Sequence, residues 1–155
     1  MYGEGMRLFQ ADHKADRSEW KSGPWDNEPD YYAWTTRAGF PAYMGRLPSG
    51  AWAGGVIAPQ APEVRSIDTC KFYSKLTHMG HAKDKEFSMG HSSPTNTPGI
   101  IDYCCSAEHW ESPGPSNRTW WRGPYKTLEE FKERCENLAD AILALHNDPN
   151  LYKDW

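Results

Sequence analysis

The sequence has no apolar run that approaches the ~20 residues of a membrane-spanning helix. It does not open with the basic and then apolar leader of a secreted chain. It also lacks a P-loop, the glycine fingerprint of dinucleotide-binding folds and a nucleophile elbow. These absences argue against Walker-type hydrolysis and dinucleotide redox chemistry. We expect a soluble, cytoplasmic protein with no membrane partner.

The sequence also lacks a large excess of one charge sign. Its 17 basic and 21 acidic residues leave a net charge of −4. Because proteins that coat DNA or RNA need a basic surface, we expect no generic nucleic-acid binding. Cysteine is scarce, and no pair has the C-x-x-C spacing of a metal or redox site, which favours a reduced compartment over a disulfide framework. The four cysteines are Cys70, Cys104, Cys105 and Cys135.

Aromatic residues, glycine and proline are abundant instead. Aromatics make up 14% of the 155 residues, and eight of them are Trp. The length fits a single domain, with residues 1–19 as a loosely ordered arm. The 13 Gly and 12 Pro predict many turns around an aromatic core.

The pattern along the chain predicts an α+β fold: a small antiparallel sheet with long loops and a C-terminal amphipathic helix packed on it. Residues 41–47 and 51–58 form a hairpin around Pro48-Ser49-Gly50, in which Gly54-Gly55 indicates a bulge or a close approach by a backbone or a ligand. Residues 70–77 and 99–106 are further strand candidates, and 20–36, 81–98 and 111–124 are predicted loops. Thr127 and Glu130 form a capping box for a helix over 128–146.

The stretch Gly23-Pro24-Trp25-Asp26-Asn27-Glu28-Pro29-Asp30 is the most distinctive part of the chain. Its Trp, Pro and carboxylate residues suit a structural loop that closes the core and a binding loop equally well. Other candidate ligand-binding residues are basic, hydroxyl or aromatic, since guanidinium groups grip phosphates and Trp faces stack on bases. The full set of ligand-binding candidates is Trp25, Glu28, Asp30, Arg46, Lys75, Thr77, Trp120 and Arg122.

His109 and Glu111 follow the predicted 99–106 strand. An imidazole beside a carboxylate can act as general acid or base, and an exposed loop histidine with an acidic neighbour explains the pair as well. The loop histidines lack the spacing of a zinc site, so we expect no metal site and name no cofactor.

The order of residues between 16 and 62 resembles a small bacteriophage and prophage protein family whose members are mostly hypothetical proteins. The resemblance rests on the Gly-Pro-Trp-x-x-Glu-Pro-Asp pattern at 23–30 and on Arg46. The family pattern places a histidine where this chain has Ala61, before Pro62. The resemblance therefore implies that position 61 and His109 form an acid–base pair that is incomplete in this chain.

Together these features predict a phage-encoded anti-defence protein in the host cytoplasm, which binds and cleaves a small cyclic nucleotide signal as a phosphodiesterase does. Two alternatives remain. One is a nucleotide sponge without turnover, and the other is an inhibitor that binds a host defence protein through exposed Trp residues. A homo-oligomer is compatible with each of them.

Overall fold

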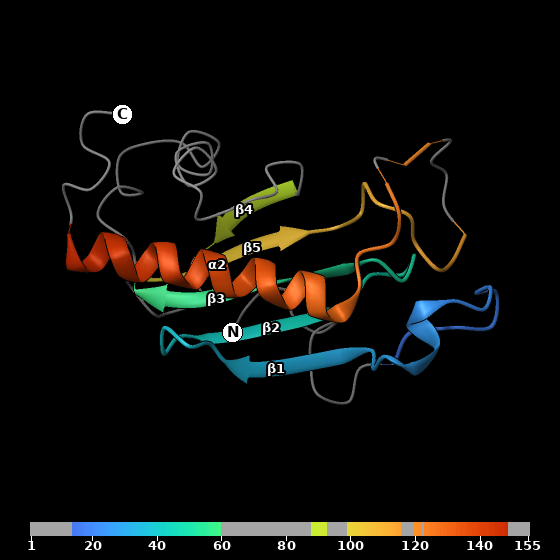
Figure 1. Cartoon of the computed structure of the whole chain (residues 1–155), viewed down its shortest axis with the longest axis horizontal. Coiled ribbons are helices and arrows are strands. Elements are labelled where there is room, and N and C mark those ends of the chain that lie inside the picture. Colours follow the sequence, from blue (N-terminus) through green and yellow to red (C-terminus); the bar gives the residue numbers. More distant parts are fainter. Residues whose placement is uncertain (1–13, 60–87, 93–98, 116–119, 122, 149–155) are drawn as a thin grey trace.

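A computed structural model describes residues 14–59, 88–92, 99–115, 120–121 and 123–148 of the chain. Within these residues, the sheet holds five antiparallel strands in the order β1-β2-β3-β5-β4. Its strands are β1 (Tyr31–Thr35), β2 (Pro41–Arg46), β3 (Trp52–Pro59), β4 (Ser88–Ser92) and β5 (Ile100–Ser106). A short 3₁₀-helix, η2 (Pro24–Asn27), precedes the sheet, and α2 (Leu128–Asn147) follows it (Figure 1).

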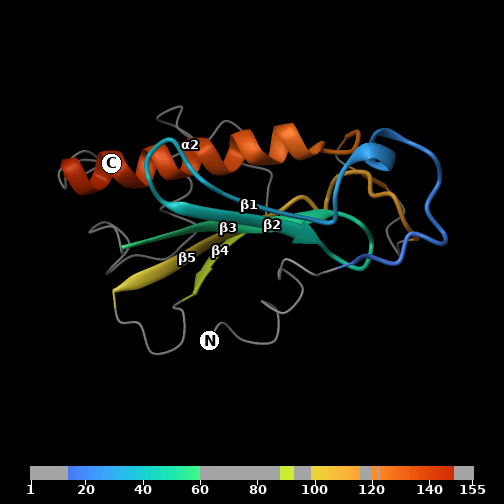
Figure 2. The ribbon, with the colours of Figure 1, turned by 90° about the horizontal axis from the view of Figure 1, so that it is seen from below.

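The predicted α+β class is confirmed, with α2 lying along one face of the sheet (Figure 2). The predicted hairpin corresponds to β2 and β3, and the 99–106 strand to β5. Thr127 accepts a hydrogen bond from the Glu130 amide, and the Glu130 carboxylate accepts one from the Thr127 amide. This reciprocal pair begins α2 where the sequence predicts it.

The core lies between α2 and the sheet. On α2 the buried apolar side chains recur at three- and four-residue steps, as one helix face requires. They are Phe131, Cys135, Leu138, Ile142 and Leu145, and they pack with Met44, Trp52, Val56, Tyr103 and Cys105 of the strands. The thiols of Cys105 and Cys135 are hydrogen-bonded, which links β5 directly to α2.

Two of the predicted loops contain strands. Residues 20–36 end in β1, and the polar 81–98 stretch contains β4, which pairs with β5 from Ser88↔Ser106 to Ser92↔Asp102. The sequence of β4, Ser-Met-Gly-His-Ser, has little intrinsic strand preference, so its pairing with β5 decides its conformation. The predicted 70–77 strand and residues 1–13 of the predicted arm lie outside the described residues.

The paired glycines of β3 are explained by their neighbours. A Cβ on Gly54 would overlap the Tyr43 carbonyl and Met44 Cα, and one on Gly55 would overlap the Tyr103 carbonyl and Cys104 Cα. The predicted close approach by a backbone is therefore found on both sides of β3. Glycine at these positions lets β2 and β5 lie close to the central strand.

We predict that Gly54→Ala destabilises the protein by about 3 kcal/mol, because backbone atoms of β2 have no room to move away from the added methyl group. Urea denaturation followed by Trp fluorescence measures the change. Ala33→Gly, at an exposed position of β1, is the control and should cost under about 1 kcal/mol. Equal midpoints for Gly54→Ala and the unmodified chain would contradict the close-approach explanation.

Candidate functional site

The side chain of Arg46, the last residue of β2, lies in a fully buried position at one end of the sheet. Its guanidinium carbon lies 3.8 Å from the centroid of the Trp52 ring and 5.4 Å from that of Trp20. Aromatic faces attract a cation, but they do not neutralise it. The charge of Arg46 therefore needs anionic and polar partners inside the protein.

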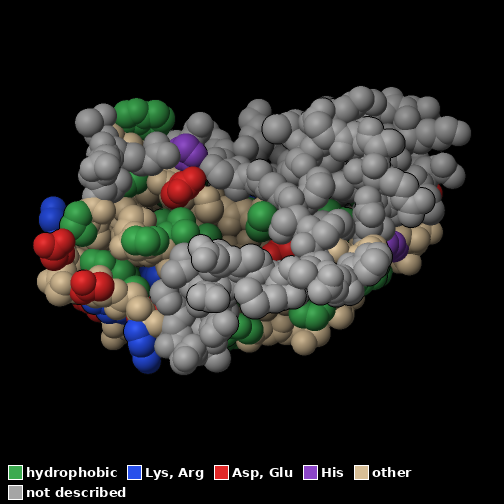
Figure 3. All heavy atoms as spheres, turned by 180° about the vertical axis from the view of Figure 1, so that it is seen from behind, with side chains coloured by type: hydrophobic (Ala, Val, Ile, Leu, Met, Phe, Trp, Pro, Cys, Tyr) green, Lys and Arg blue, Asp and Glu red, His purple; other side chains and the backbone are tan. Residues whose placement is uncertain are grey.

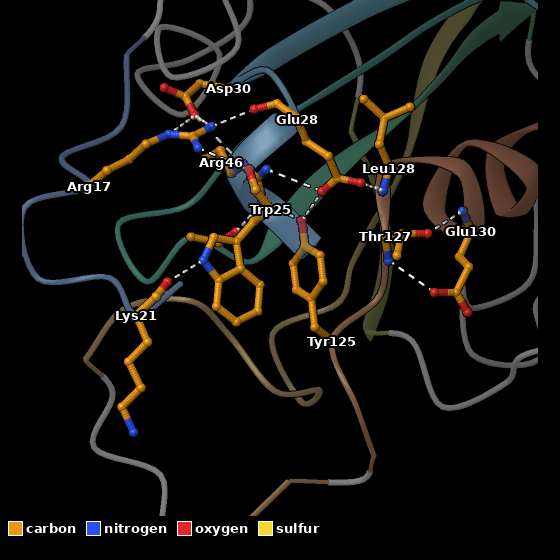
Figure 4. Close-up of polar contacts among 11 residues, drawn as sticks. Arg17, Lys21, Trp25, Glu28, Asp30, Arg46, Tyr125, Thr127, Leu128 and Glu130 are labelled. Atoms are coloured by element: carbon orange, nitrogen blue, oxygen red, sulfur yellow. Dashed lines mark hydrogen bonds and ion pairs between the residues drawn. The ribbon is translucent and has the colours of Figure 1, made fainter. Parts of the chain in front are cut away.

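Those partners come from the loop before β1, from the adjacent β2–β3 turn and from the segment before α2 (Figure 4). Nη1 of Arg46 donates to the Gly50 carbonyl at 3.0 Å and to the Tyr125 hydroxyl. Nη2 reaches Oε1 of Glu28 at 3.4 Å, and Nε lies 3.7 Å from Oδ1 of Asp30. Both carboxylates are themselves largely shielded from solvent. The pairing thus offsets the cost of burying the guanidinium charge.

Glu28 connects this buried charge to the start of α2. Its Oε1 accepts from the Tyr125 hydroxyl, and its Oε2 accepts from the amide of Leu128 at 2.7 Å. Leu128 is the first residue of the helix, whose initial amides have no partner within the helix. Glu28 therefore acts as a capping carboxylate supplied from a remote loop, where the helix dipole also favours negative charge.

Asp30 is held by Arg17. The Nε of Arg17 donates to Asp30 Oδ1 at 3.0 Å, and the amide of Ala15 donates to Oδ2 at 3.0 Å. Arg17 also donates to the carbonyls of Trp25 and Glu28. Burial acts to raise the pKa of Asp30, but the bonds from Arg17 and Ala15 and the charges of Arg17 and Arg46 outweigh it and lower the pKa. Asp30 therefore remains ionised and pairs with two arginines.

Trp25 closes the cluster from η2. It is buried, its indole N–H donates to the Lys21 carbonyl at 2.7 Å, and its ring packs edge-to-face on Tyr125 at 5.0 Å. We call the set Arg17, Trp25, Glu28, Asp30, Arg46 and Tyr125 the Arg46 network. The structure thus brings the predicted residues Trp25, Glu28, Asp30 and Arg46 together. Their polar groups bind one another and the helix start, and a ligand role for them stays a prediction.

Other predicted site residues are placed only in part. His109 is half-buried and Glu111 is exposed, in a segment whose backbone is joined to the β2–β3 turn by the bond from the Gly114 amide to the Ser49 carbonyl. Among the described contacts, neither His109 nor Glu111 is bonded to the Arg46 network. Ala61, Lys75, Thr77 and Arg122 lie outside the described residues.

Arg17, Tyr125 and Trp20 are parts of the site that sequence reasoning did not select. Arg17 and Trp20 lie within the 16–62 stretch on which the family resemblance was drawn, and this was the available signal. Tyr125 had none, because its partners Glu28 and Arg46 lie 97 and 79 residues away.

A cleft of about 360 Å³ opens beside the Arg46 network. It is lined by Lys14, Ala15, Asp16, Ser18, Glu19, Trp20, Arg46, Leu47, Pro48 and Pro115. Its side chains carry both charge signs, and Figure 3 shows basic and acidic side chains interspersed at this end of the molecule.

Within the described part of the chain, no three His, Cys, Asp or Glu residues lie close enough to hold a metal ion.

A second buried polar pair lies on the sheet face opposite α2. The Tyr43 hydroxyl donates to Oδ2 of Asp102 at 2.6 Å, while Oδ1 of Asp102 has no hydrogen-bond partner among the described residues. Burial raises the pKa of Asp102 to about 6, although the bond from Tyr43 acts to lower it. Burial and the neighbouring Asp102 raise the pKa of the Cys104 thiol to about 11, which disfavours a nucleophilic thiolate.

Trp120 differs from the other described Trp residues in its exposure. Trp120 is 61% exposed, whereas Trp25, Trp52 and Trp110 are buried. A Trp in this setting has a free face for a partner.

Among the described residues, no helix has both the length and the apolar character needed to cross a bilayer.

We predict that Glu28→Gln lowers the free energy of unfolding by about 2 kcal/mol. The amide keeps the shape of the carboxylate but leaves the buried Arg46 with one anionic partner fewer. Glu19→Gln is the matched control, since Glu19 is exposed and borders the same cleft. It should change stability by less than about 0.5 kcal/mol. Equal effects of the two substitutions in urea denaturation would show that the Glu28 charge does not matter.

The raised pKa of Asp102 predicts a pH-dependent stability. The folded state binds this proton more tightly than the unfolded chain, whose carboxyl has a pKa near 4. The contribution of Asp102 is therefore fully present below that value and is lost as the pH rises through about 6. Relative to the Asp102→Asn variant, the free energy of unfolding of the unmodified protein should fall by about 2 kcal/mol as the pH rises from about 4 to about 8.

Asp30→Asn is the control of opposite sign. Because the pKa of Asp30 is lowered, its contribution is present above the unfolded value and is lost as the pH falls. Urea denaturation of all three proteins across this range measures both slopes. A constant difference between the unmodified protein and Asp102→Asn would contradict a buried, proton-binding Asp102.

Comparison of the chain with protein-family models, with curated proteins and with solved structures finds no match.

Proposed function

We propose that this protein acts by binding rather than by catalysis, and that it inhibits a host defence protein with Trp120 as its anchor. The observation that carries the proposal is the 61% exposure of Trp120. Trp is the residue type most enriched among the side chains that dominate protein–protein binding energy. Burying one in a partner's pocket removes a large apolar area from water.

The segment that presents Trp120 is held to the body of the protein at several points. The Ala107 amide donates to the Trp52 carbonyl at 2.9 Å, and the Glu111 amide donates to the Gly123 carbonyl at 3.0 Å. Lys126 lies over the Trp110 ring at 4.0 Å. These contacts fix residues 107–111 and 123–126, which lie before and after Trp120 in the chain, to the body of the protein.

The described geometry favours binding over bond cleavage. Catalysis by an acid–base pair needs two groups within reach of one substrate. His109 and Glu111 share no hydrogen bond among the described contacts, and the carboxylates of Glu28 and Asp30 are engaged by arginines and by the start of α2. The family resemblance implies that a bacteriophage encodes this protein. The proposed target is therefore a protein of the bacterial host, which it would bind in the host cytoplasm.

The second candidate function is a nucleotide sponge, and the cleft beside Trp20 favours it. A volume of about 360 Å³ lies within the range of small-molecule sites. Lys14 and Ser18 offer a cation and a hydroxyl for a phosphate, and Trp20 offers an aromatic ring for the base. Asp16 and Glu19 in the same lining oppose an anionic ligand. We therefore place this candidate second.

Trp120→Ala tests the proposal in a pull-down from a lysate of the bacterial host. We expect the unmodified protein to retain one stoichiometric partner and Trp120→Ala to weaken that binding by more than about tenfold. Glu111→Ala, an exposed change on the same segment, should bind as the unmodified protein does.

Equilibrium dialysis against cyclic and linear nucleotides forms the second arm of this experiment. Unchanged nucleotide recovered after denaturation would favour the sponge, and a cleaved product would restore the enzyme hypothesis. Equal partner retention by Trp120→Ala and the unmodified protein would overturn Trp120 as the anchor.

A further inference from the structure

We infer that the outer edge of β1 is a docking site for an extended, basic segment of another protein, which adds to the sheet as a further strand. This surface differs from the Trp120 loop, and the inference does not rest on the proposed function. It follows from the backbone of β1, from the aromatic side chains beside it and from the charges on α2.

Among the described residues, the backbone of β1 is paired along one edge only. The Arg46 amide donates to the Asp30 carbonyl, and the Thr36 amide donates to the Phe40 carbonyl. Antiparallel pairs alternate between bonded and non-bonded positions, so the even-numbered residues of β1 bond to β2. The N–H and C=O groups of Tyr31, Ala33 and Thr35 therefore point away from β2. Thr35 lies opposite Pro41, which has no N–H to give, in agreement with this register.

The residues of β1 itself include none of the features that commonly block an added strand. Natural edge strands are commonly blocked by a charged residue, a proline or a bulge. The sequence of β1, Tyr-Tyr-Ala-Trp-Thr, contains no charge and no proline, and it pairs with β2 without interruption. Ala33 and Thr35 are exposed. In the described part of the sheet, β1 is the outermost strand on this side.

Aromatic side chains form an apolar surface next to the open edge. Tyr32 and Trp34 face α2 and stack with ring centroids 5.4 Å apart. The Trp34 indole donates to Glu136 of α2 at 2.7 Å, and Lys132 covers the Tyr32 ring at 5.2 Å. Both rings remain half-exposed. A segment paired with β1 would therefore lay alternate side chains against them.

The charge beside this edge selects the kind of segment. A groove of about 280 Å³ is lined by Arg37, Glu129, Lys132, Glu133 and Glu136, three acids against two bases. Arg37 is already bound by Asp140 and Glu136. Glu129 is exposed, and Glu133 has a 61% exposed side chain whose ion pair with Arg37 is long, at 3.7 Å. Exposed carboxylates at this position favour Lys or Arg in the added strand.

The same charges disfavour a second copy of this chain as the occupant. Two β1 edges paired around a two-fold axis would bring two sets of these carboxylates together, and β1 has no basic residue to offset them. The net charge of −4 adds to the repulsion. Strand addition to an exposed sheet edge draws its affinity from main-chain hydrogen bonds and its specificity from such side-chain pairs.

The test titrates the full-length, ¹⁵N-labelled protein with a capped peptide of alternating Lys and Val residues. We expect the Ala33 and Thr35 amide resonances to shift and their hydrogen exchange to slow. A peptide of alternating Glu and Val should bind at least about tenfold more weakly.

Two substitutions with matched controls locate the contact. Ala33→Pro removes an outward N–H without removing any bond to β2, and it should weaken peptide binding about tenfold. Ala33→Ser keeps that N–H and should bind as the unmodified protein does. Glu133→Lys should weaken binding about threefold. Glu108→Lys, an exposed change on another part of the surface, should have no effect.

Several outcomes would overturn the inference. Peptide shifts confined to other strands, or equal binding of the acidic peptide, would do so. If the Ala33 and Thr35 amides are protected from hydrogen exchange in the free protein, the edge is already covered. Protection that is independent of protein concentration would show that this chain itself covers the edge. Protection that grows with protein concentration would show that a second copy covers it. An Ala33→Pro variant that keeps its fold by circular dichroism and binds normally would also rule out main-chain pairing at β1.

Discussion

The buried guanidinium group of Arg46 is the constraint on which this end of the molecule depends. A charge in a fully buried position is tolerated only when anions and hydrogen-bond acceptors surround it. Glu28, Asp30, Gly50 and Tyr125 meet that need, and they come from the N-terminal loop, the β2–β3 turn and the segment before α2. Arg46 thereby fixes these three segments relative to one another.

This arrangement explains why the N-terminal part of the chain is rich in Trp, Pro and carboxylates. Trp20 and Trp52 present aromatic faces to the Arg46 guanidinium, and Trp25 packs edge-to-face on Tyr125. Arg17 holds both the Asp30 carboxylate and the carbonyls of Trp25 and Glu28. Residues that suggest a nucleotide site in the sequence thus also serve to close one end of the core. Among the described residues, the surfaces for which we propose partners are the cleft beside Trp20, the Trp120 loop and the outer edge of β1.

Local patterns accounted for the elements that the sequence predicts well. The Thr127–Glu130 capping box and the spacing of Phe131, Cys135, Leu138 and Ile142 define α2, because a helix is specified by residues near one another in the chain. The turn at Pro48-Ser49-Gly50 likewise defines the β2–β3 hairpin. β1 lies in a predicted loop although its Tyr, Trp and Thr residues favour a strand. β4 also lies in a predicted loop, because its conformation depends on pairing with β5 rather than on its own residues.

For the candidate site, the sequence alone determined which residues stand out: Trp25, Glu28, Asp30 and Arg46 in a stretch with little regular pattern. Only the tertiary structure decided that their charged groups meet one another, that Glu28 caps α2 across 100 residues, and that Trp120 is exposed while Trp110 is buried. The physical reason is that composition and spacing report local preference. Burial and charge pairing between distant segments arise only when the chain has folded.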